Sequence, residues 1–166
     1  IELDQVGLNK KLEIKDIRNI KVTSFNDNLK NNDFHIGKHG TLKNTIFIIG
    51  KLFDAEPLLK SLYKTDDKKM LSKDFNSEIK VNLDKAITGT NDDVSNFSMI
   101  ASIKKGSHNK LSLKGNFSEN EIIEMSIYQV DENQRTLQVI SDRARPFIKN
   151  FDFIKGFEGG KLEYES

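Results

Sequence analysis

The sequence contains no cysteine among its 166 residues. This absence excludes thiolate catalysis and disulfide bonds, and it removes the usual ligands of structural zinc sites. Charge of one sign is not in excess either, because 26 Lys and Arg residues stand against 25 Asp and Glu residues. A net charge of +1 argues against a nucleic-acid-binding protein, which carries a clear basic excess. No apolar run reaches the roughly 18 residues that a transmembrane helix needs.

The size and the ends of the chain suggest one piece of a larger molecule. A length of 166 residues suits one domain or one contiguous part of a longer repetitive protein. The chain begins without methionine in a strand-like run, residues 1–6, and it ends in another, residues 159–166. We therefore expect residues 1–166 to be one segment of a longer repetitive β protein.

Most of the chain alternates apolar and polar residues with a period of two, which is typical of half-buried strands. Residues 76–141 hold five such stripes, separated by turn signals near 105–107, 118–120 and 131–133. This pattern predicts an antiparallel meander with one apolar face. Residues 1–50 repeat the pattern in shorter, more polar runs, and they end in a stronger strand over residues 45–49.

Two segments break the alternation and predict short helices at about 54–64 and 142–151. The first has Asp54 as its N-cap, and each has a proline in its first turn, Pro57 or Pro146. These are the only prolines of the chain, and a strand precedes each helix. The sequence thus predicts a strand–short-helix unit that occurs twice. Residues 65–75 between the units are a charged linker.

Motifs of enzymes and cofactor sites are weak. His35 and His39 have the spacing of a metal-binding pair on a helix, but Gly37 and Gly40 beside them favour a strand and a turn. The glycine-rich residues 156–162 lack the first glycine and the Ser/Thr of a phosphate loop, and they lead into a strand. No Gly-x-Ser-x-Gly elbow occurs. We expect no catalytic residue, metal or cofactor.

An ordered set of motifs over residues 46–166 resembles the AsmA-like proteins, above all their YhdP- and TamB-type members and the AsmA-like C-terminal region. A strand followed by Asp54-Ala55-Glu56-Pro57-Leu58-Leu59 is similar to the family's "D-A-x-P-L-L". Residues 111–115 match "L-x-L-x-G", residues 135–142 match "R-x-L-x-V-x-S-D", and residues 159–162 match "G-G-x-L". Arg145 departs from the pattern, because relatives usually carry glycine there.

The resemblance implies a mainly β (α+β) fold, in which a repetitive, twisted antiparallel sheet forms an open groove or half-barrel with two short helices. It also implies a periplasmic protein anchored in the inner membrane of a Gram-negative bacterium by a helix outside this chain. Such proteins take part in phospholipid transport toward the outer membrane and in maintaining its barrier. The implied partners are phospholipid acyl chains, the membrane through that anchor, and other envelope proteins, and no nucleic acid is implied.

Acyl chains in a groove require apolar area and no catalytic group. The candidate lipid-facing residues are Val81, Met99, Leu111, Leu113, Met125, Ile127, Leu137 and Val139. The same stripes could instead form an ordinary core, and this alternative stays open. A different function is a structural or interaction module that assists outer-membrane protein assembly or secretion, with exposed sheet edges pairing to client strands. A hydrolase or metal enzyme is the third alternative.

Overall fold

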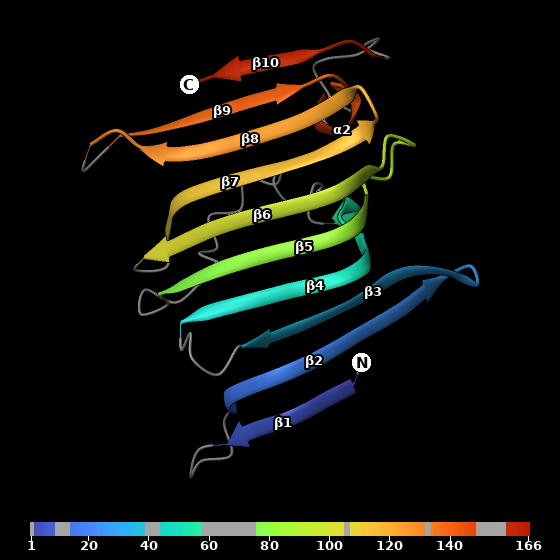
Figure 1. Ribbon diagram of the computed structural model, residues 1–166, viewed down its shortest axis with the longest axis vertical. Helices are drawn as coiled ribbons and strands as arrows, with labels where there is room; N and C mark the ends of the chain where they lie inside the picture. The colour runs from blue at the N-terminus through green and yellow to red at the C-terminus, as the bar shows by residue number, and fades with distance from the viewer. Residues whose placement is uncertain are drawn as a thin grey trace.

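A computed structural model describes residues 2–8, 14–38, 44–57, 76–104, 107–131, 134–148 and 159–166. These residues form one ten-stranded sheet and very little helix (Figure 1). The strands are β1 (Glu2–Leu8), β2 (Ile14–Asn26), β3 (Leu29–Lys38), β4 (Thr45–Asp54), β5 (Ser77–Ile87), β6 (Val94–Lys104), β7 (Ser107–Ser118), β8 (Glu121–Gln129), β9 (Arg135–Ser141) and β10 (Leu162–Glu165). The mainly β class predicted from alternation is confirmed.

The strands lie side by side in the order of the chain, from β1 at one end of the sheet to β10 at the other (Figure 1). The sheet is not closed, since β1 and β10 are far apart. Strands β5 to β9 pair antiparallel in sequence, which is the meander predicted over residues 76–141.

The prediction of a fully antiparallel sheet is wrong at one place, because β4 and β5 pair in parallel. The sheet is therefore mixed. A parallel pair cannot be joined by a tight turn, and it needs a crossover of a dozen or more residues. Residues 55–76 supply that connection, and the helix start predicted after β4 was the signal that the chain crosses over there.

The described helical residues lie at the two predicted helices. α2 (Arg145–Ile148) falls within the predicted 142–151 and has Pro146 in its single turn. Of the predicted helix at 54–64, Glu56 and Pro57 are helical. The backbone N–H of Glu56 donates to Asp54 Oδ1 at 3.1 Å, as expected for an N-cap. Residues 58–64 and the charged linker 65–75 lie outside the described residues.

The buried core lies on one face of the sheet, in two neighbouring clusters. The first contains Phe34, Val81 and Leu83, and the ring of Phe34 meets that of Phe53 edge to face at 5.6 Å. Gly50 is paired with Phe34, and a Cβ at Gly50 would lie 2.4 Å from backbone atoms of β3. Only glycine therefore allows β3 and β4 to approach so closely here.

The second cluster contains Ala86, Val94 and Ile123, and Phe147 of α2 packs against it. A bulge in β6 near Asn96, which has a φ of 50°, shifts the alternation between the two clusters. Because Phe147 packs on this cluster, α2 covers the end of the sheet at which β5 ends and β6 begins.

Candidate functional site

The predicted lipid-facing residues come together on the core face of the sheet. Their register forms a central row, in which each residue is paired with the next across nine neighbouring strands. This row consists of Ile20, Ile36, Ile48, Val81, Met99, Leu113, Met125, Val139 and Tyr164. Paired residues on neighbouring strands point to the same face, so the row is continuous across β2 to β10.

A second row runs beside the central row, two residues away along each strand. It consists of Ile46, Ile79, Ala101, Leu111, Ile127 and Leu137. The two rows together contain all eight predicted lipid-facing residues. Sequence alternation placed these residues on common faces strand by strand, and the register now joins the strands into one apolar surface.

The residues of this surface differ in how far their side chains are exposed. Val81 and Val139 are each only 5% exposed and belong to the core by this measure. The six other candidates are half-buried: Met99, Leu111, Leu113, Met125, Ile127 and Leu137. The half-buried candidates therefore lie over β6 to β9, from the middle of these strands toward the strand ends away from α2. Ile20, Ile36 and Ile48 of the central row are half-buried as well, on the other side of Val81.

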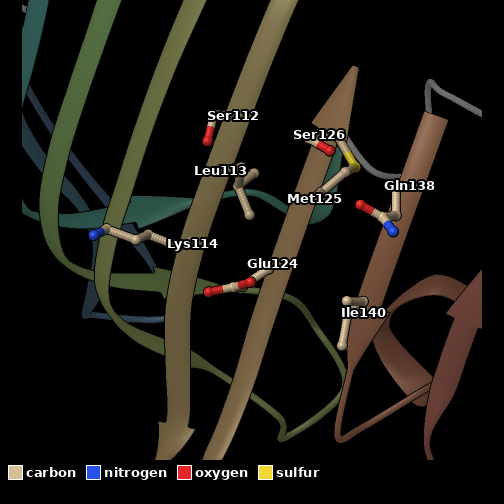
Figure 2. Close-up of a pocket in the computed structure, with 8 residues that line it drawn as sticks. All are labelled: Ser112, Leu113, Lys114, Glu124, Met125, Ser126, Gln138 and Ile140. Atoms are coloured by element: carbon tan, nitrogen blue, oxygen red, sulfur yellow. The ribbon is translucent and has the colours of Figure 1, made fainter. Parts of the chain in front are cut away.

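The opposite face of the same strands is mostly polar, although Ile100, Ile122 and Ile140 are exposed on it. A hollow of about 150 Å³ lies there between β7, β8 and β9 (Figure 2). By alternation, six of its residues share that face: Ser112, Lys114, Glu124, Ser126, Gln138 and Ile140. Leu113 and Met125 are the paired residues between them and complete the lining. This hollow has room for about five water molecules or one benzene-sized group, and it lies on the face opposite the predicted groove.

Arg143, which lies between β9 and α2, contacts the β5–β6 loop and the β7–β8 hairpin at the α2 end of the sheet. Its Nη1 donates to Asp92 Oδ1 at 2.8 Å, and its Nε donates to Glu121 Oε2 at 3.2 Å. Its guanidinium also lies over the ring of Phe117, 5.6 Å from the centroid. Asp92 is buried in the β5–β6 loop, and its second carboxylate oxygen lies 3.7 Å from Arg145 Nε. This polar cluster closes one end of the apolar surface.

The electrostatics of the polar cluster follow from these contacts. Hydrogen bonds from Arg143 and Ser118 lower the pKa of Glu121. The carboxylates of Glu121 and Asp92 in turn raise the pKa of Arg143 above its usual value. Glu121 and Arg143 therefore both stay charged at neutral pH, which suits a structural ion pair and not proton transfer.

Asp142 fixes the neighbouring strand end. Its Oδ2 accepts the backbone N–H of Ile122 at 2.8 Å, and its Oδ1 lies 2.8 Å from Lys161 Nζ. Lys161 first, and then the Ile122 N–H, lower the pKa of this carboxyl. Sequence reasoning did not assign these roles to Asp142 and Arg143. One feature of the sequence could have pointed to Arg143: arginine is scarce in this chain, and Arg143 directly follows the Ser141-Asp142 motif.

The two helix starts contact the same loop. A Cβ at Gly89 would fall 2.3 Å from Glu56 Cδ, so the Glu56 side chain lies directly against the β5–β6 loop. Arg145 approaches Asp92 in the same loop. Glu56 and Arg145 occupy equivalent places in the two Ala-x-Pro sequences. This arrangement gives the predicted repeat a common structural role, because each copy holds one side of the β5–β6 loop.

The remaining candidates from the sequence are not gathered into a site. His35 is exposed on β3, and His39 lies outside the described residues. Within the part of the chain that the structure describes, no group of three or more His, Cys, Asp or Glu side chains is placed to hold a metal ion. Its helices are also too short or too polar to cross a bilayer.

No protein-family model matches this chain, and neither the curated proteins nor the solved structures contain a significant match.

Proposed function

We propose that this chain is a periplasmic segment of an AsmA-like protein that binds phospholipid acyl chains on the apolar surface of its sheet. The observation that carries the proposal is the pair of apolar rows, whose half-buried part spans Met99, Leu113 and Met125. Lipid binding requires no catalytic group, so the protein would act without enzymatic activity and without a cofactor.

The central row offers a short accessible stretch for an acyl chain lying across the strands. The whole row crosses eight steps of about 4.8 Å, but the half-buried stretch Met99, Leu113 and Met125 between buried Val81 and Val139 spans two steps, about 10 Å. Each Å² of apolar area that lipid covers contributes roughly 25 cal/mol. Met99 and Met125 lie on either side of Leu113, and their flexible thioether side chains adapt to ligands of variable shape.

The cellular role proposed here rests on the order of the sequence motifs. We propose that the full protein is anchored in the inner membrane of a Gram-negative bacterium by a segment outside this chain. It would carry phospholipids toward the outer membrane and so maintain the outer-membrane barrier. The open, unclosed sheet supports a groove or half-barrel whose inner surface is the apolar face.

A second candidate function is a scaffold that assists outer-membrane protein assembly or secretion. The observation that favours it is the position of β1 and β10 at the two ends of the strand order. An end strand offers backbone N–H and C=O groups to an added strand. Crosslinks from β10 to a protein, with none from the apolar rows to lipid, would favour this function.

The test compares two neighbouring residues on opposite faces of β7. We expect the full protein, purified without denaturation, to carry phospholipid that native mass spectrometry detects. Leu113→Asp should abolish the bound lipid, because it places a charge in the central row. Ser112→Asp, its matched control on the polar face, should retain the lipid. Equal lipid content in both variants, with both folded by circular dichroism, would contradict the proposal.

A further inference from the structure

The tip of the β2–β3 hairpin is unusually apolar for an exposed turn. Phe25 is 63% exposed and Leu29 is 74% exposed, the highest values among the exposed large hydrophobic residues of the described chain. The turn between them is made by Asp27 and Asn28, both with positive φ, at 48° and 63°. Two such residues are typical of a tight two-residue hairpin turn. Polar side chains would satisfy this turn equally well, so the apolar pair calls for another explanation.

The hairpin is held firmly at its base. Ser24 Oγ donates to Asn31 Oδ1 at 2.7 Å and accepts from Asn32 Nδ2 at 2.9 Å. Asn31 and Asn32 also bond to Asp54 at the end of β4, at 3.2 and 2.9 Å. A bulge at Ser24 and Phe25 redirects the strands just beyond this network. The tip, residues 25–30, therefore projects past the end of β4 as a fixed element (Figure 1).

The two apolar side chains lie on opposite faces of the tip. Phe25 is paired with Lys30, whereas Leu29 is paired with Asn26, and neighbouring pairs in a hairpin point to opposite faces. A flat protein surface would cover only one of these faces. A fluid apolar medium surrounds both, so the arrangement fits a lipid environment better than a one-sided protein contact.

The tip carries no excess of basic residues that would attract anionic headgroups. Lys30 is paired with Asp33 at 3.0 Å, and Asp27 adds one negative charge at the turn. A tip without basic excess has no attraction for anionic headgroups. Binding would therefore come from Phe25 and Leu29 entering the boundary between headgroups and acyl chains, to a depth of about 5–10 Å.

We propose that the β2–β3 hairpin tip inserts shallowly into the surface of a phospholipid bilayer through Phe25 and Leu29. This contact does not require the apolar rows to bind lipid. A variant in the rows, such as Leu113→Asp, should leave it unchanged, which distinguishes its failure from failure of the proposed function.

The sequence allows a clean test, because it contains no tryptophan. A single tryptophan at Phe25→Trp then reports only on the tip. Ile100→Trp is the matched control, because Ile100 is 54% exposed on the face of the sheet opposite the apolar rows. With phosphatidylcholine vesicles, Phe25→Trp fluorescence should shift to the blue and be quenched by brominated acyl chains. Ile100→Trp fluorescence should not change. An unshifted Phe25→Trp spectrum at saturating vesicle concentration would overturn the proposal.

Vesicle co-sedimentation of further variants separates a bilayer from a protein partner. Phe25→Ser and Leu29→Ser should each weaken binding by about tenfold. Asp27→Asn should strengthen it, because the substitution removes a charge from the inserted turn and asparagine tolerates the positive φ. Weaker binding by Asp27→Asn, or unchanged binding by Phe25→Ser and Leu29→Ser, would overturn the proposal, because insertion of an apolar tip predicts the reverse. A blue shift that follows protein concentration without vesicles would overturn it in favour of a second copy of this chain.

Discussion

Two leucines on the same face of the sheet should differ in their contribution to stability. Leu83 is 4% exposed and packs in one cluster with Phe34 and Val81. Leu83→Ala should therefore cost about 3 kcal/mol, within the range of roughly 2–5 for emptying a buried leucine site. Leu113 is half-buried, so Leu113→Ala should cost only about 1 kcal/mol, because part of the side chain already meets water.

Urea unfolding followed by circular dichroism measures both costs. With a slope of about 2 kcal/mol per M, the midpoint should fall by about 1.5 M for Leu83→Ala and about 0.5 M for Leu113→Ala. The slope itself should stay unchanged in both variants. Equal midpoint losses, or a greater loss for Leu113→Ala, would show that Leu113 is packed as tightly as Leu83 and is an ordinary core residue.

Three further predictions concern residues around the apolar surface: Gly50 in β4, Asp142 directly after β9, and Arg143 in the polar cluster. Gly50→Ala should cost more than about 2 kcal/mol in urea unfolding, because its Cβ meets backbone, whereas Gly159→Ala meets nothing within 4 Å and should be neutral; equal midpoints would contradict this. The pKa of Asp142 is lowered in the folded state, so its contribution to stability is present above about pH 3.8 and is lost as the pH falls through the lower folded pKa. In Asp142→Asn, the free energy of unfolding should lack this contribution when it is measured as the pH falls. The same pH dependence in the variant and the parent protein would contradict the prediction. Arg143→Lys should speed amide hydrogen exchange in residues 88–93, because lysine cannot reproduce the two-sided guanidinium contact; unchanged exchange would exclude that role.

The strands were predictable from the sequence because their signal is local. Alternation at Ile79, Val81 and Leu83, and again at Leu111 and Leu113, places side chains on faces without any knowledge of partners. The turn signals between the stripes then indicate hairpins, and β5 to β9 do follow one another as neighbours.

The parallel pair and the polar cluster depend on relations that the local pattern does not contain. A crossover after Asp54 changes the direction of β5, but it leaves the alternation within each strand unchanged. Arg143 is 51 residues from Asp92 in sequence, and only the folded register brings these side chains to 2.8 Å. The row through Met99, Leu113 and Met125 likewise exists only once the register of β6, β7 and β8 is known.

Photo-crosslinking tests directly whether phospholipid binds on the apolar rows. A photoreactive amino acid is placed at Leu113 in the full protein in its own cells, and a second variant carries it at Ser112 on the opposite face. We expect phospholipid adducts from position 113 and none from position 112 after illumination. Adducts from both positions alike, or from neither while the protein is folded, would contradict lipid binding on the apolar rows.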